Sequence, residues 1–177
     1  MNKRRLRRLF WAFVCICLTF FLTWSVAEFV GQRTEVEGMS MSPTLKDKEN
    51  LILDKISYRF RDPERYEIVV FPPKYKENTY YIKRVIGLPG ETVQIVDGQI
   101  LINGETYKEG RDFPVISNPG MASSPVTLES GDYFVLGDNR NNSEDSRYGS
   151  IGKVNKKYIT GKLWFKLFPV KSIGFFE

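Results

Sequence analysis

Ser40 and Lys83 are the two residues that could form a catalytic pair in this chain of 177 residues. The chain contains no histidine, which limits the bases that could activate a serine. A serine hydroxyl is a poor nucleophile until a neighbouring base takes its proton. Without an imidazole the Ser-His-Asp arrangement is excluded, so only a neutral lysine or an N-terminal amine could be that base. Lys83 lies in a largely apolar run, Tyr80–Gly87, and is the best candidate.

The residues around Ser40 predict a tight, non-helical turn. Gly38 precedes the serine and Pro43 follows it. Glycine is typical of turns and proline fixes the backbone just beyond. Such a turn can expose a hydroxyl and direct its own backbone N–H at a developing oxyanion. The alternative is a serine that bonds only to its local backbone, which describes most serines in such a sequence.

Lys83 is expected in a strand, where alternate residues share a face. It then stands beside Tyr81 and Val85. Apolar neighbours remove water from an ammonium group and lower its pKa, which is the condition for a lysine to act as a base. A lysine on a solvated face is the ordinary alternative. The pairing with Ser40 in a chain without histidine favours the catalytic interpretation.

The N-terminal segment predicts a membrane anchor. Residues 1–8 carry five basic side chains, and residues 9–27 carry no charge. As a helix these 19 residues would rise about 28 Å, close to the thickness of a bilayer's hydrocarbon core. The alternative is a cleaved secretory signal at Ser25–Ala27, but signal h-regions are usually about 7–15 residues long. We expect a cytoplasmic tail (1–8), an anchor helix (9–30) and an extracytoplasmic domain (31–177). The protein would then be a single-pass type II protein of the cell membrane.

Composition excludes several function classes. The formal charge is +5, but the five basic residues of the tail leave 21 basic residues against 21 acidic ones in the rest of the chain. A nucleic-acid-binding face therefore has no support. The two cysteines, Cys15 and Cys17, lie in the hydrophobic span, so the outer domain has no disulfide and no thiolate zinc site. We expect no metal and no cofactor.

Short β-branched or apolar runs separated by turn residues predict a mainly β domain. We expect an antiparallel sheet coiled into a barrel-like shape behind one transmembrane helix. Residues 93–130 are expected to form a smaller insertion of β-meander and loop, with two-residue turns at Asp97-Gly98 and Asn103-Gly104 and a loop over 118–125. The expected strands are 50–53, 67–71, 80–86, 93–96, 99–102, 133–136 and 159–168.

The segment Gly137–Gly149 is rich in Asp and Asn. It does not fit a calcium loop, because counting from Asp138 puts Arg140 at position 3 and Gly149 at position 12. A loop held by side-chain-to-backbone bonds and an Asp145–Arg147 ion pair is the physical default. A glycosylation sequon at 141–143 is attributed to chance.

Four segments, taken with the single hydrophobic span, match a known family. They are Gly38–Thr44, Glu67–Phe71, Tyr81–Glu91 and Gly137–Gly149. Their residues, order and spacing resemble the characteristic boxes of type I (leader) signal peptidases. The short chain with one anchor resembles the Gram-positive bacterial branch. The resemblance extends from the basic tail to about Lys166.

The resemblance implies a Ser-Lys endopeptidase that removes signal peptides from exported preproteins, with Ser40 as nucleophile and Lys83 as general base. It implies no cofactor. Its partners would be preprotein signal peptides, the lipid bilayer and, transiently, the export machinery. The resemblance also implies supporting residues. Ser143 would supply a hydroxyl that orients the lysine, and Asp145 with Arg147 would form an ion pair beside the site. Asp138 with Arg84 would form a second ion pair.

Two positions depart from the family pattern. Gly38 occupies a position where some members carry a serine hydroxyl in the oxyanion hole. Losing such a donor can cost about 2.7–4 kcal/mol, so a backbone N–H or a water must replace it. Glu67 replaces a more usual aspartate.

The family cuts after small residues at positions −1 and −3 of an extended substrate. Five apolar residues match the positions that line those pockets, and ordinary core packing is the alternative for all of them. They are Val36, Met41, Leu45, Val70 and Ile82. The apolar C-terminal residues, from Trp164 to Phe176, are expected either to enter the membrane interface or to form a final core strand.

Two other functions remain open at this point. One is a Ser-Lys protease of the self-cleaving repressor type, whose catalytic core is similar. Its soluble, DNA-regulating character disagrees with the membrane span and the neutral outer domain. The other is a membrane-anchored, non-enzymatic β domain that binds export or envelope partners.

Overall fold

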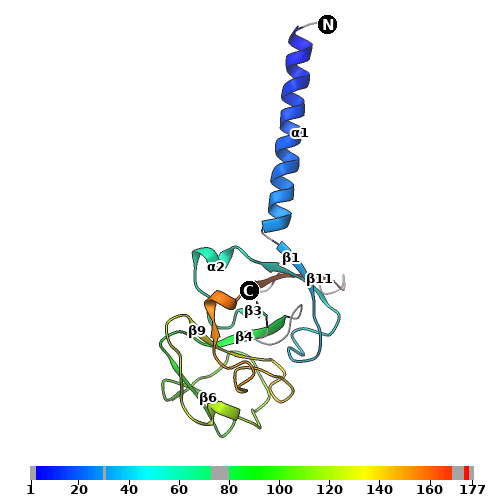
Figure 1. Cartoon of the computed structure of the whole chain (residues 1–177). Helices are drawn as coiled ribbons and strands as arrows, with labels where there is room; N and C mark the ends of the chain where they lie inside the picture. Colours follow the sequence, from blue (N-terminus) through cyan, green and yellow to red (C-terminus); the bar gives the residue numbers. More distant parts are fainter. Residues whose placement is uncertain (1–2, 30, 73–79, 169–173, 176–177) are drawn as a thin grey trace.

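A single long helix, α1 (Lys3–Phe29), precedes a β domain that holds all the described strands (Figure 1). The computed structural model describes residues 3–29, 31–72, 80–168 and 174–175. Within these residues, one helix is long and apolar enough to cross a membrane, over Lys3–Trp24 with a mean hydropathy of 1.7. None of that stretch is buried inside the protein. The helix begins within the basic tail, earlier than the expected start at residue 9, and Val30 lies outside the described residues.

The larger sheet is antiparallel throughout and has eight strands. Its order is β1-β2-β11-β3-β4-β9-β10, with β12 paired to β11. The strands are β1 (Gly31–Glu35), β2 (Asn50–Asp54), β3 (Ile68–Phe71), β4 (Tyr81–Gly87), β9 (Asp132–Leu136), β10 (Val154–Asn155), β11 (Gly161–Phe168) and β12 (Gly174–Phe175).

A smaller antiparallel sheet has the order β7-β6-β5-β8. The hairpin between β5 (Thr92–Val96) and β6 (Gln99–Ile102) turns at Asp97-Gly98, where both residues have positive φ, 50° and 75°. That turn suits the right-handed twist of the strands. A second turn at Asn103-Gly104 leads into β7 (Glu105–Thr106), and β8 (Val126–Thr127) pairs with β5. Both predicted turns are confirmed.

Three short helical turns complete the described part of the chain. They are α2 (Ser57–Phe60), η1 (Gly120–Ser123) and η2 (Lys156–Tyr158). η1 occupies much of the predicted 118–125 loop. The predicted strand from Ile159 begins at Gly161, because η2 precedes it.

The two faces of β3 and β4 contribute to different parts of the core. Val70 and Ile82 are cross-strand partners and pack in a cluster with the residues around Ser40. Phe71 and Val85 lie on the opposite face, in a cluster with β9 and β10. A third cluster joins Ile86 to the inner side of the smaller sheet. Because alternate strand residues face opposite ways, Lys83 is placed on the Phe71 face.

The expected fold class, mainly β with a curled antiparallel sheet and one N-terminal apolar helix, is confirmed. The C-terminal region contributes a strand, β11, that pairs with β2, β3 and β12. Trp164 and Leu167 on this strand are about 40% exposed, at 41% and 39%. Residues 169–173 and 176–177, on which the membrane-interface expectation also rests, lie outside the described residues.

Candidate active site

Ser40 and Lys83 meet although 43 positions separate them in the sequence. The Nζ of Lys83, on β4, lies 2.7 Å from the Oγ of Ser40. Lys83 is only 2% exposed, and its Nζ lies 5.3 Å from the ring centre of Tyr81, as the alternation of β4 predicts. This geometry allows direct proton transfer between the hydroxyl and the amine.

Burial lowers the pKa of Lys83 from 10.5 to about 8. The carboxylates of Asp145, Glu144 and Asp138 act in the opposite direction and limit the fall. A lysine with a pKa of 10.5 is almost entirely protonated at pH 7. At a pKa of about 8, roughly a tenth of the molecules hold a neutral amine at that pH. A lysine in this state could act as a base at neutral pH.

The turn that carries Ser40 is held from the far end of β9. The backbone N–H of Asn139 donates to the Ser40 carbonyl at 3.0 Å, and its side-chain Nδ2 donates to the Met39 carbonyl at 3.1 Å. Gly137 permits this approach, because a Cβ there would lie 2.5 Å from the Ser40 carbonyl and would collide with the Ser143 side chain. Gly137 and Asn139 belong to one of the four family-like segments, but the residues alone did not predict their contact with the turn that carries Ser40.

Two buried ion pairs surround this turn. The guanidinium of Arg147 binds the Asp145 carboxylate through Nε at 2.8 Å and Nη2 at 2.9 Å, and both side chains are at most 1% exposed. Asp145 also accepts the Gly137 N–H at 3.1 Å. Arg84 binds Asp138 in the same two-bond manner. Both ion pairs, Asp145 with Arg147 and Asp138 with Arg84, were expected from the sequence and are present in the structure.

Ser143 lies next to Gly137, close to the dyad's turn. The hydrogen bond that the structure gives its Oγ runs to the backbone carbonyl of Glu144, at 3.5 Å. Among the described residues no hydrogen bond joins Ser143 to Lys83. Its orienting role therefore stays a prediction.

Gly38 and Glu67, the two residues that depart from the family pattern, each make identifiable hydrogen bonds. Gly38 has φ of +85°, and its N–H donates to Asp47 Oδ1 at 2.8 Å. Its amide is thus committed to holding the turn. Glu67 accepts hydrogen bonds from Arg61 at 2.9 and 2.5 Å and from the Tyr58 hydroxyl at 3.0 Å. Glu67 therefore ties α2 to the start of β3 and does not reach the dyad through these contacts.

The five residues matched to substrate pockets gather in one cluster, which includes Met41, the residue after Ser40. All are buried, from 0% to 7% exposed, so they pack together as a core would. Their closeness to the nucleophile's turn is compatible with a shallow pocket above them, and that role stays a prediction. They are Val36, Met41, Leu45, Val70 and Ile82.

Comparison with known proteins identifies the family. The model described as "Signal peptidase, peptidase S26" matches residues 6–168. The chain belongs to the S26 signal peptidase family. The resemblance seen in the sequence is confirmed, and the protein is an enzyme, a serine peptidase of the signal peptidase I type.

Relatives of this S26 signal peptidase cover most of its length. It is 40% identical over 158 residues to a probable signal peptidase I-2 of Synechocystis, covering 86% of this chain and 70% of the relative. It is 39% identical to signal peptidase I of Leptolyngbya laminosa, with 90% and 79% covered. For signal peptidase I of Bacillus caldolyticus the identity is 36%, with 98% and 97% covered. A crystal structure of a signal peptidase I from Enterococcus faecalis aligns with a TM-score of 0.47 and 36% identity, over 58% of this chain and 97% of that one.

Membership of the S26 signal peptidase family decides between the functions left open by the residues. The non-enzymatic interpretation is set aside, because relatives that match nearly the whole chain are peptidases by name. The self-cleaving repressor interpretation gives way to the signal peptidase one for the same reason.

Proposed function

We propose that this enzyme cleaves the signal peptides of exported preproteins by acyl transfer on a Ser40–Lys83 dyad. The observation that carries the proposal is the 2.7 Å contact between a buried amine and a hydroxyl in a chain without histidine. The lowered pKa of Lys83, about 8, supports its action as a base.

In the acylation step the neutral Lys83 amine takes the Ser40 proton while Oγ attacks the scissile carbonyl. The resulting ammonium then protonates the leaving nitrogen, the C–N bond breaks, and the signal peptide remains as an ester on Ser40. In deacylation Lys83 takes a proton from water, whose oxygen attacks the ester and releases the new carboxylate. The proton returns to Ser40, so the dyad is restored.

The oxyanion of each tetrahedral intermediate needs a hydrogen-bond donor. Position 38 carries no side chain, and the Gly38 N–H is bonded to Asp47. We assign the donor role to the backbone N–H of Ser40, in the turn fixed by Asn139.

Substrate is proposed to bind as an extended strand along β4. The pairing of β4 with β9 begins at Arg84, and the Tyr81–Lys83 part of β4 pairs with β3 on one side only, as far as the described strands extend. A free strand edge can accept a peptide through main-chain hydrogen bonds. The cluster that includes Met41, Val70 and Ile82 would then favour small side chains at positions −1 and −3.

The anchor helix is proposed to hold the enzyme in the cell membrane with its N-terminus in the cytoplasm. The five basic residues before the span support this orientation. Tethering places the dyad near the signal peptides as they emerge in the membrane, which raises their effective concentration. Contact with the export machinery would be transient.

The test uses the full-length enzyme in detergent with a purified preprotein. Ser40→Ala and Lys83→Ala should each abolish cleavage while the thermal unfolding transition is retained. Retention of near wild-type turnover by either variant would contradict the dyad.

A further inference from the structure

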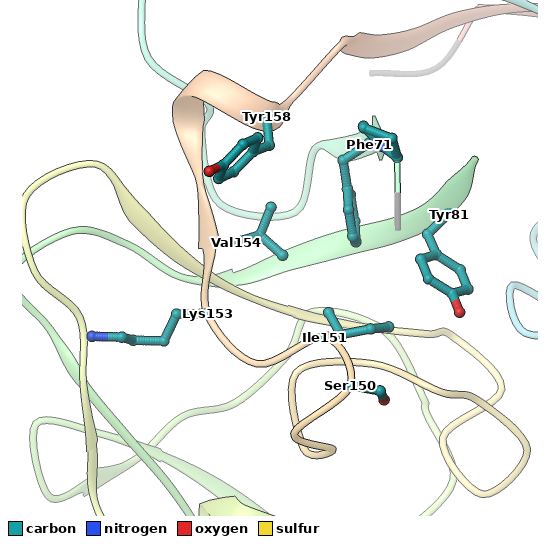
Figure 2. Close-up of a pocket in the computed structure, with 8 residues that line it drawn as sticks. Phe71, Tyr81, Ser150, Ile151, Lys153, Val154 and Tyr158 are labelled. Carbon is teal, nitrogen blue, oxygen red and sulfur yellow. The ribbon is translucent and has the colours of Figure 1, made fainter. Parts of the chain in front are cut away.

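A mostly apolar cavity of about 330 Å³ lies beside the dyad (Figure 2). Its size is at the lower end of the range for ligand pockets, which are typically lined by apolar and aromatic side chains. The side chains that line it come from the end of β3, the start of β4 and the segment from 150 to 158. They are Phe71, Pro72, Tyr81, Ser150, Ile151, Lys153, Val154 and Tyr158.

Tyr81 lies between the cavity and the dyad. Phe71 and Tyr81 are cross-strand partners with ring centres 5.9 Å apart, and together they form one wall. The Nζ of Lys83 lies 5.3 Å from the centre of the Tyr81 ring. One aromatic ring therefore separates the base from the cavity.

The cavity carries no unbalanced charge that would favour an ionic occupant. Lys153, its one charged lining residue, points away from the other side chains in Figure 2. Its Nζ pairs with Asp132 at 3.1 Å and with Glu129 at 3.6 Å. Ser150 donates to the Glu144 carboxylate at 2.6 Å, so its hydroxyl is also satisfied. The remaining walls suit an apolar side chain.

We propose that this cavity binds an apolar side chain from the first residues of the mature protein, on the leaving side of the scissile bond. This inference rests on the proposed function, since it assigns a second specificity site to the same reaction. The enzyme would then contact the substrate after the scissile bond as well as at positions −1 and −3.

The position of Lys83 indicates the leaving side. The lysine must protonate the leaving nitrogen, so that nitrogen lies close to Nζ when the bond breaks. Nζ stands on the Tyr81 face of β4, whereas Val70 and Ile82, matched to the −1 and −3 pockets, stand on the opposite face. The chain that follows the leaving nitrogen therefore starts beside the Phe71–Tyr81 wall.

The reach of an extended chain limits which residues can enter. A strand advances about 3.3 Å per residue, so four residues span about 13 Å. The occupant is accordingly expected within the first four mature positions.

The experiment compares preproteins that share one signal peptide and cleavage site and differ at a single mature position, +1 to +4, with Leu or Asn there. The two side chains are similar in size and differ in polarity. Wild-type enzyme in detergent should cleave the Leu substrate with a kcat/KM about tenfold higher at one of these positions, a modest value for a hydrophobic pocket. Equal kcat/KM values for Leu and Asn at all four positions would overturn the proposal. A further pair of preproteins with Leu or Asn at −2, in the signal peptide, is the comparison, and a Leu preference found only in that pair would also overturn the proposal.

Two wall variants test the assignment to this cavity. Tyr158→Ala removes a wall that is 53% exposed, and Ser150→Phe fills the space. Each should reduce the Leu preference below about threefold while cleavage of the Asn substrate persists. Phe60→Ala, at an aromatic residue that is 84% exposed and outside the cavity lining, is the matched control and should keep the preference.

The outcomes separate the two proposals. A Leu preference that survives both wall variants, or one that Phe60→Ala also removes, would overturn the cavity assignment and leave the dyad intact. Cleavage of the Asn substrate that persists in Ser40→Ala would instead contradict the proposed function.

Discussion

Arg84 and Asp138 form a buried ion pair with two hydrogen bonds, from Nε at 2.7 Å and from Nη2 at 2.6 Å. Arg84 follows Lys83 on β4, and Asp138 precedes Asn139, whose N–H holds the Ser40 carbonyl. The pair therefore joins the strand that carries Lys83 to the segment that holds the Ser40 turn.

Asp138→Ala should lower both stability and activity, because it leaves the Arg84 charge buried without its partner. Removing one member of a buried pair typically costs about 3–5 kcal/mol. The free energy of unfolding and kcat/KM on a preprotein would measure the two effects. Asp62→Ala is the control, since Asp62 pairs with Lys156 at 2.5 Å but is 76% exposed. The control should cost about 1 kcal/mol or less, and an equal cost for both variants would contradict the linking role.

Gly137→Ala should impair catalysis more than stability. The added methyl would displace Ser143 and the Ser40 carbonyl, which lies 2.5 Å from the Cβ position. A displacement of about 1 Å at a catalytic group can cost roughly 100-fold in rate. Steady-state kinetics on one preprotein would show the loss. Gly110→Ala, where a Cβ meets nothing within 4 Å, should keep wild-type activity. Full activity of Gly137→Ala would show that the turn does not depend on this contact.

Much of the fold could be predicted because its signals are local. β3 and β4 are runs of apolar residues, and the β5–β6 hairpin has the Asp97-Gly98 turn. β1 was missed because its residues, Gly31–Glu35, are mainly polar and become a strand only by pairing with β2. α2 was missed because four residues carry no readable helical period.

The site was predicted less evenly. The absence of histidine and the alternation of β4 pointed to Lys83 and its face. The Asp145–Arg147 pair followed from the loop's own residues, and the Asp138–Arg84 pair came from the family resemblance alone. The contact of Asn139 with Ser40 joins residues 99 positions apart and has no local signal. The cavity beside Tyr81 is likewise assembled from the β3–β4 pair and the distant segment 150–158, so no single stretch of sequence indicates it.

Lys83→Met should stabilise the inactive enzyme at pH 7. Burial lowers the pKa of Lys83 from 10.5 to about 8, so the folded state binds its proton less readily than the unfolded state does. This difference lowers the free energy of unfolding of the wild type by about 3 kcal/mol below pH 8, and the loss fades as pH rises towards 10.5. Unfolding of both proteins across this pH range would reveal it.

The control for that measurement is Lys157→Met, at an exposed lysine, which should show no such pH-dependent difference. A stability difference between Lys83→Met and the wild type that does not change between pH 7 and 10.5 would contradict the lowered pKa of Lys83.

The pH dependence of kcat/KM for preprotein cleavage tests the neutral lysine base most directly. With a Lys83 pKa of about 8, activity should rise about tenfold per pH unit below that value and level off above it. A profile that stays flat from pH 6 to 10, with chemistry limiting the rate, would contradict a dyad in which Lys83 deprotonates Ser40.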